Sequence, residues 1–157
     1  MVLVHNKLQS ESYEGYFLSL GLSDLNEVQN KDNFPTFDWR SEILNPERYC
    51  YKLVVEGNNE IQALVSYSID EGFLTIHYLE KNNMNTHPIA LSITGPVLSF
   101  VSHESEYLGN EGFVVILIKK SLRIIRHYER YGALYIGKNR MIIDDVASKE
   151  LIAVYYN

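Results

Sequence analysis

The sequence predicts a mixed α/β protein with a mostly antiparallel sheet of about six to seven strands, flanked by helices. Two observations lead to this fold class. Residues 50–80 hold three apolar stretches separated by short turn sequences, as in an antiparallel meander. A helical segment then separates these stretches from a strand that is apolar throughout, and this order indicates a parallel crossover. The 157 residues are expected to form one domain, with a helical and loop part at 1–48 and the sheet core at 49–157.

The first 48 residues are the least regular part of the chain. Two short helices are expected there, at Ser12–Leu20 and Ser23–Gln29. A polar stretch follows and ends in Phe37, Asp38 and Trp39. Because loops of this kind often carry recognition residues, Trp39 is a candidate substrate-binding residue. Closure of the edge of the core is the alternative for this side chain.

The second half of the chain alternates helices and strands. The expected meander strands are Cys50–Glu56, Glu60–Ile69 and Phe73–Glu80. They are followed by a helix from Gly95 to Leu108, a strand at Phe113–Ile118, a helix from Leu122 to Tyr131, a hairpin of Leu134–Ile136 with Arg140–Asp144, and a helix at Val146–Tyr155. Pro96 suits the first turn of its helix, and Gly109 and Gly132 suit helix ends.

Composition excludes several classes of protein. Hydrophobic residues make up 46% of the chain and charged residues 22%, which favours a folded domain over disorder. The formal net charge of −6 argues against a protein that mainly binds nucleic acid or an anionic membrane. Cys50 is the only cysteine, so neither an internal disulfide nor a zinc site built from cysteines is expected. Without a long apolar run or a signal-peptide core, a cytoplasmic protein is expected.

Five segments have distinctive sequences beyond the order of elements. They are Glu60–Val65, Tyr78–Glu80 followed by Asn85, Ser105–Gly112 leading into Phe113–Ile118, His127–Ala133, and Arg140–Asp144. Together with the element order they resemble the GNAT superfamily of acyl-CoA-dependent N-acetyltransferases, and the last segment resembles a small bacterial branch of it. The resemblance covers roughly residues 37–156.

The resemblance implies acetyl-CoA as co-substrate and no metal. It also implies that an amine, carried by a small molecule or a protein, attacks the thioester directly. It places the pantetheine arm along Leu79 and Glu80, with Glu80 as the catalytic base and Tyr128 as the acid that protonates the departing thiolate. It places the pyrophosphate on a loop that comprises Ser92, Ile93, Thr94, Gly95 and Pro96. Ser92 and Thr94 stand where the family pattern has glycines, so the loop departs from that pattern.

The residues themselves leave alternatives open. Tyr128 lies on the apolar face of its helix, where a core aromatic is also expected. Glu80 could be a surface charge at a strand end. His77, expected on the same strand face as Leu79, is a substrate-binding candidate and an alternative base. The basic arc, comprising Lys119, Arg123, Arg126 and Arg130, fits a solvated helix face better than a phosphate site. A catalytically impaired domain that binds proteins, with a homodimer as one option, is the alternative function.

Overall fold

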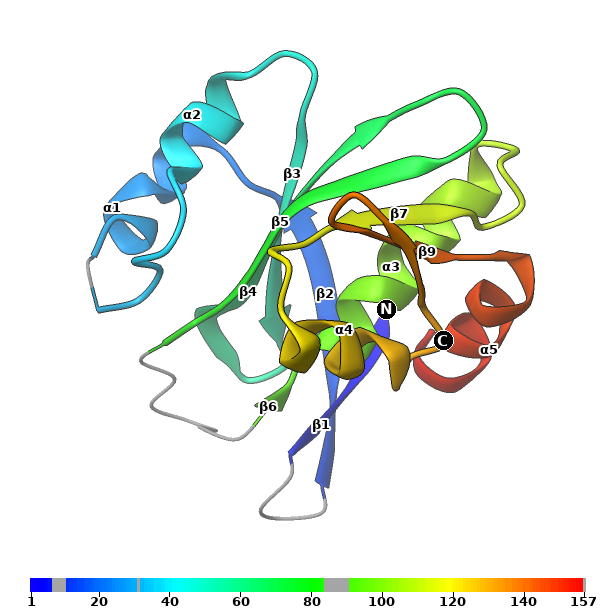
Figure 1. Ribbon diagram of the computed structural model, residues 1–157. Helices are drawn as coiled ribbons and strands as arrows, with labels where there is room; N and C mark the ends of the chain where they lie inside the picture. The colour runs from blue at the N-terminus through cyan, green and yellow to red at the C-terminus, as the bar shows by residue number, and fades with distance from the viewer. Residues whose placement is uncertain (7–10, 31, 84–90, 157) are drawn as a thin grey trace.

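The computed structural model describes residues 1–6, 11–30, 32–83 and 91–156 (Figure 1). Its strands are β1 Val2–Asn6, β2 Glu11–Ser19, β3 Tyr49–Val55, β4 Asn58–Ile69, β5 Leu74–Lys81, β6 Leu91–Ser92, β7 Val114–Leu117, β8 Leu134–Gly137 and β9 Arg140–Ile143. Its helices are the 3-10 helix η1 Leu22–Asp24 and the α-helices α1 Leu25–Val28, α2 Trp39–Leu44, α3 Thr94–Tyr107, α4 Leu122–Glu129 and α5 Asp145–Tyr155. The mixed α/β class is confirmed. The described residues form nine strands, in the order β6-β1-β2-β3-β4-β5-β7-β9-β8, where six to seven were expected.

The additional strands lie mainly at the amino terminus, and the helix expected at Ser12–Leu20 is wrong. Most of this segment forms β2, which pairs antiparallel with β1 on one side and β3 on the other. Tyr13 and Phe17 pack against the core, and Gly15 between them fits closely, because a Cβ there would lie 2.8 Å from Cγ2 of Val4. This period of two is the mark of a strand. It is concealed in the sequence because Gly15 contributes no apolar side chain.

The remaining elements follow the sequence-based expectation closely. β3, β4 and β5 form the antiparallel meander, and β8 and β9 form the hairpin. The crossover is confirmed as well, since β5 runs parallel to β7 after the chain has passed through α3. Among the described residues, the other strand pairs are antiparallel. The fork described below begins at this parallel pair.

Helices cover both faces of the sheet (Figure 1). On one face, α3 and α5 pack against the main core, which includes Val65, Leu98 and Leu151. On the other face, α1 and α2 cover a smaller cluster that includes Leu64 and Trp39. Successive residues of a strand point to opposite faces, so β4 and β5 contribute side chains to both clusters.

A β-bulge interrupts the pairing of β4 with β5. Ser66 pairs with Tyr78, whereas Tyr67 pairs with Ile76, so that His77 is the extra residue on β5. A bulge bends its strand and places two consecutive residues on one face. His77 accordingly contacts Ser68, and Tyr78 packs in the smaller cluster with α2, while Leu79 packs against the main core. The expectation that His77 shares a face with Leu79 is therefore wrong.

Candidate active site

A fork opens between β5 and β7 just beyond the bulge. The two strands pair in parallel at three positions, the last of which joins Ile76 to Ile116. β5 then continues to Lys81, and within the described residues no pair with β7 follows. The bulge explains the separation, because it bends β5 at the point where the pairing ends.

The backbone of Leu79 points into this fork. In an antiparallel pair, residues alternately direct both backbone polar groups toward the partner strand and away from it. The N–H of Asn82 donates to the carbonyl of Gln62 on β4 over 2.9 Å, which fixes the phase of the alternation. Counting back by pairs, Glu80 faces β4 and Leu79 faces the opposite side. A strand edge of this kind offers a donor and an acceptor to an extended ligand.

Glu80 is buried and holds the loop that precedes α2. Its Oε1 accepts a hydrogen bond from the indole Nε1 of Trp39 over 2.8 Å, and its Oε2 accepts from the backbone N–H of Thr36 over 2.9 Å. The side chain of Trp39 is itself only 2% exposed and lies in the smaller cluster with Leu64. Both residues thus have a structural role, in which the carboxylate anchors the loop and the indole closes this part of the core.

Tyr128 lies on the other face of the sheet. It projects from α4, packs against the main core, and is half-buried. Burial raises the pKa of its hydroxyl to about 12, so the phenol stays protonated in neutral solution. Tyr128 packs against the main core, whereas Glu80 is hydrogen-bonded to Trp39 of the smaller cluster, so a group that met both would have to reach through the fork.

The start of α3 is buried next to α4. The hydroxyl of Thr94 lies 3.0 Å from Nε2 of His127 on α4. Ile93, Thr94, Gly95 and Pro96 are all buried, whereas Ser92 precedes the helix on β6, paired with His5 of β1. The first helical hydrogen bond runs from the N–H of Val97 to the carbonyl of Ile93, and no side chain caps this end. The N–H groups of Thr94 and Gly95 therefore precede the helical pattern.

Gly95 is required by packing against α5. A Cβ at this position would lie 2.6 Å from Cε2 of Tyr155, well inside van der Waals contact. The ring of Tyr155 therefore occupies the side of α3 that the missing side chain leaves open. This contact explains the glycine without any phosphate group, and no pattern in the sequence indicates it.

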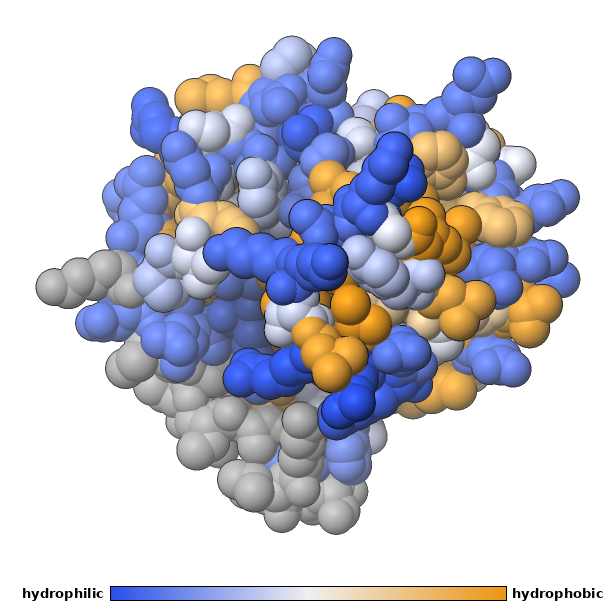
Figure 2. Space-filling model, in the orientation of Figure 1, coloured by the Kyte–Doolittle hydropathy of each residue, from blue (hydrophilic) through white to orange (hydrophobic). Residues whose placement is uncertain are grey.

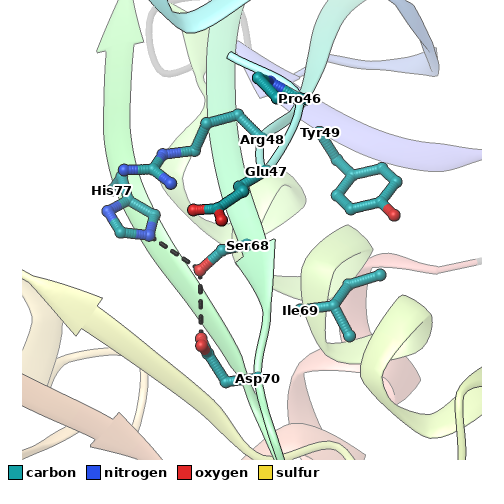
Figure 3. Close-up of a pocket in the computed structure, with 8 residues that line it drawn as sticks. All are labelled: Pro46, Glu47, Arg48, Tyr49, Ser68, Ile69, Asp70 and His77. Carbon is teal, nitrogen blue, oxygen red and sulfur yellow. Dashed lines mark hydrogen bonds between the residues drawn. The ribbon is translucent and has the colours of Figure 1, made fainter.

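A cavity of about 480 Å³ lies beside His77 on the α2 face of the sheet (Figure 3). It is lined by Pro46, Glu47, Arg48, Tyr49, Ser68, Ile69, Asp70 and His77. Nε2 of His77 lies 2.8 Å from the hydroxyl of Ser68, which donates to Asp70 over 3.1 Å. Burial and the Arg48 guanidinium lower the pKa of His77 from its ordinary value. Sequence reasoning did not identify Ser68, Asp70 or Arg48, because the bulge that brings His77 to them leaves no local signal.

Other surfaces show less organisation. The basic arc is exposed, as expected for a solvated face. Apolar side chains lie among hydrophilic ones on the face that carries α4 and the β8–β9 hairpin, Leu122 and Leu134 being among the exposed apolar residues (Figure 2). In the part of the chain that the structure describes, no group of three or more His, Cys, Asp or Glu residues is arranged to hold a metal ion. Of the helices in that part, none is long and apolar enough to span a membrane. Asn85 lies outside the described residues.

Comparisons with known proteins identify the fold. Neither protein-family models nor curated protein sequences match this chain. Several solved structures match it. The spermidine N-acetyltransferase of Vibrio cholerae, in complex with CoA and spermine, has a TM-score of 0.61 and 11% sequence identity, and the match covers 87% of this chain and 98% of that one. A GNAT-family acetyltransferase of Staphylococcus aureus matches with a TM-score of 0.52 and 12% identity over 82% and 97% of the two chains.

A third similar structure is the KacTA–DNA complex, with a TM-score of 0.54 and 13% identity over 98% of this chain and 99% of that one. These likenesses extend over most of the chain at low sequence identity, so they concern the architecture. The mixed sheet is thus a known arrangement, and the chain has the fold of the GNAT-family acetyltransferases.

Proposed function

We propose that this chain is an acetyl-CoA-dependent N-acetyltransferase. The observation that carries the proposal is the fork between β5 and β7, into which the N–H and C=O of Leu79 point. The pantetheine arm of CoA is extended and contains amide groups, which pair with a strand edge as a peptide does. Leu79 would hold this arm in the fork, with Glu80 beside it on the strand.

The start of α3 supports the proposal for the pyrophosphate. The N–H groups of Thr94 and Gly95 precede the first helical hydrogen bond, and a helix amino terminus favours anions. Ser92 and Ile93 lead into this turn, and Pro96 occupies a position that has no N–H to offer. The hydroxyls of Ser92 and Thr94 would take part where the family pattern has glycines.

The reaction would be a direct transfer. The amine attacks the thioester carbonyl, the C–N bond forms, the C–S bond breaks, and Tyr128 protonates the sulfur. A phenol with a raised pKa is protonated before the reaction, as this role requires. Glu80 is the base that the family resemblance implies. The complex of the Vibrio cholerae enzyme with CoA and spermine supports an amine acceptor for this fold.

Two observations favour a second candidate, a GNAT-fold domain that has lost efficient CoA binding and serves as a protein-binding module. Tyr155 packs on Gly95, and both oxygens of Glu80 accept hydrogen bonds from the protein itself. Replacing Ser92 and Thr94 together by glycine tests whether the loop limits binding. Under the first function, the affinity for CoA rises. Loss of the Thr94 contact to His127 could loosen the helix start and mask this rise, and a melting curve of the variant detects such loosening.

Release of free thiol from acetyl-CoA in the presence of a panel of amines tests the proposed function. Tyr128→Phe removes one hydroxyl and should lower kcat by ~10²–10⁴-fold, the usual contribution of a positioned acid. Tyr131→Phe is the matched control, because Tyr131 packs against the same core next to Tyr128. Equal rates for both variants and the parent protein contradict the role of Tyr128, and no thiol release with any amine contradicts the function.

A further inference from the structure

The cavity beside His77 adjoins the point where the pairing of β5 with β7 ends. His77 is the residue that follows Ile76, the last residue of β5 to pair with β7. The bulge turns its side chain to the α2 face, where it lines the cavity together with Arg48, Ser68 and Asp70 (Figure 3). The volume of about 480 Å³ falls within the range of about 300–1,000 Å³ that small-molecule sites occupy.

The hydrogen bonds around Ser68 favour one tautomer of His77. The carboxylate of Asp70 can only accept, so the hydroxyl of Ser68 donates its hydrogen to it over 3.1 Å. The hydroxyl of Thr75 donates to the same oxygen over 2.6 Å. With its hydrogen directed to Asp70, the Ser68 oxygen accepts from Nε2–H of His77 at 2.8 Å. In this arrangement neutral His77 carries its hydrogen on Nε2, and the lone pair of Nδ1 is left to take a proton.

Charged groups from three elements surround this imidazole. Burial lowers the pKa of His77 most, and Arg48, which precedes β3, lowers it further. Glu42 of α2 and Asp70 after β4 raise it. Arg48 is itself paired through Nε with Glu42 at 3.1 Å. The combined effect is a pKa below the ordinary value, so that His77 is neutral near pH 7.

The geometry points to His77 as the proton acceptor for the amine, with Ser68 and Asp70 as positioning residues, and to the cavity as the site of a cationic amine acceptor. This inference rests on the proposed function and replaces Glu80 as the base. Glu80 has both oxygens engaged by Trp39 and Thr36, whereas the cavity is open at His77.

The proton balance of the step is complete. One proton of the ammonium group passes to Nδ1 of His77 and from there to solvent. The nitrogen lone pair then forms the C–N bond, the C–S bond breaks, and the thiolate takes the proton of the Tyr128 hydroxyl. The second proton lost by the nitrogen restores that hydroxyl. No oxidant, reductant or metal ion takes part in any of these transfers.

The cavity lining indicates the class of acceptor. Glu47 and Asp70 contribute two carboxylates, and the one guanidinium, that of Arg48, is already paired with Glu42 outside the lining. A cationic amine is therefore attracted, and an acceptor with an anionic group next to its amine is disfavoured. Putrescine, a diamine with two positive charges, is a suitable probe, and butanediol of the same chain length is its uncharged control.

Nuclear magnetic resonance of protein with isotope-labelled histidine tests the site without any turnover. We expect the Nε2–H tautomer for His77, and a shift of its signals with putrescine but not with butanediol at millimolar concentration. The exposed His5 on β1 is the internal control and should not move. Arg48→Gln should raise the pKa of His77 and Asp70→Asn should lower it, in line with the sign of each charge. An Nδ1–H tautomer, or no response to putrescine, overturns the inference.

Turnover separates this inference from the proposed function. His77→Gln should lower kcat for putrescine acetylation by ~10²–10⁴-fold and remove the acidic limb of the pH profile, while Glu80→Gln, once shown to be folded, should keep that limb. Asp70→Asn should move the limb to lower pH, which a merely structural residue would not do.

If acetyl-CoA is consumed with putrescine and His77→Gln keeps the parent rate, His77 is not the base although the function stands. If acetyl-CoA binds and putrescine is not acetylated, the acceptor class is wrong. If acetyl-CoA does not bind, the proposed function fails, and the resonance titration still decides whether the cavity takes amines.

Discussion

Replacing Glu80 by glutamine should destabilise the fold before it affects any chemistry. Two N–H groups, the indole of Trp39 and the amide of Thr36, donate to the two carboxylate oxygens at 2.8 and 2.9 Å. A glutamine offers one oxygen, so its NH₂ group must face the other donor. One N–H, that of the buried indole or the part-buried one of Thr36, is then left without an acceptor, which costs ~1–3 kcal/mol, and the remaining bond loses a charged acceptor worth roughly another 1 kcal/mol. We expect a loss of about 2–4 kcal/mol in the free energy of unfolding.

Urea unfolding measures this loss directly. Trp39 is the only tryptophan in the chain, so its fluorescence follows both unfolding and the local contact, and far-ultraviolet circular dichroism gives an independent transition. Glu71→Gln, which changes an exposed turn residue in the same way, is the matched control and should stay within ~0.5 kcal/mol of the parent. If Glu80→Gln also stays within that margin, the carboxylate does not anchor the loop, and the structural argument against Glu80 as the base fails.

Three further predictions concern packing, capping and the thiol. Gly95→Ala should destabilise the protein by ~1–3 kcal/mol through its clash with Tyr155, reduced by up to ~1 kcal/mol because alanine has the higher helix propensity. In a Tyr155→Ala background the same change should be stabilising. A gain of stability in the parent background contradicts the contact. Asp144→Ala removes the carboxylate that caps α5 and should cost ~1 kcal/mol in urea unfolding, so an unchanged midpoint refutes the cap. Burial raises the pKa of the Cys50 thiol to about 11, so less thiolate forms at mildly alkaline pH than in the unfolded chain. A thiol reagent should therefore react slowly until urea is added. Rapid labelling of the folded protein disproves the burial.

Much of the fold could be predicted because its signals are local. β4 and α3 have their own apolar patterns, and α3 has Pro96 and Gly109 at its two ends, where backbone preference alone marks a boundary. β2 could not be predicted in the same way. Its period of two depends on Gly15, whose fit against Val4 becomes visible only when β1 is in place.

The candidate site was less predictable, because its key contacts join distant parts of the chain. Trp39 and Glu80 are separated by 41 positions, and neither residue type indicates that it is the other's partner. The same holds for Gly95 and Tyr155, a pair that gives the glycine a reason unrelated to phosphate. The bulge at His77 arises from the register of two strands, so sequence spacing placed this side chain on the opposite face.

Calorimetric titration of the purified protein with acetyl-CoA, with CoA in parallel, tests the central claim most directly. The account predicts saturable binding with a Kd in the micromolar range, which corresponds to a binding free energy of about −8 kcal/mol. The binding would use the edge of β5 at Leu79 and the start of α3. Absence of heat and of saturation at millimolar ligand, in protein whose unfolding curve is cooperative, would contradict it. The fork would then belong to a GNAT-fold domain that no longer uses acetyl-CoA.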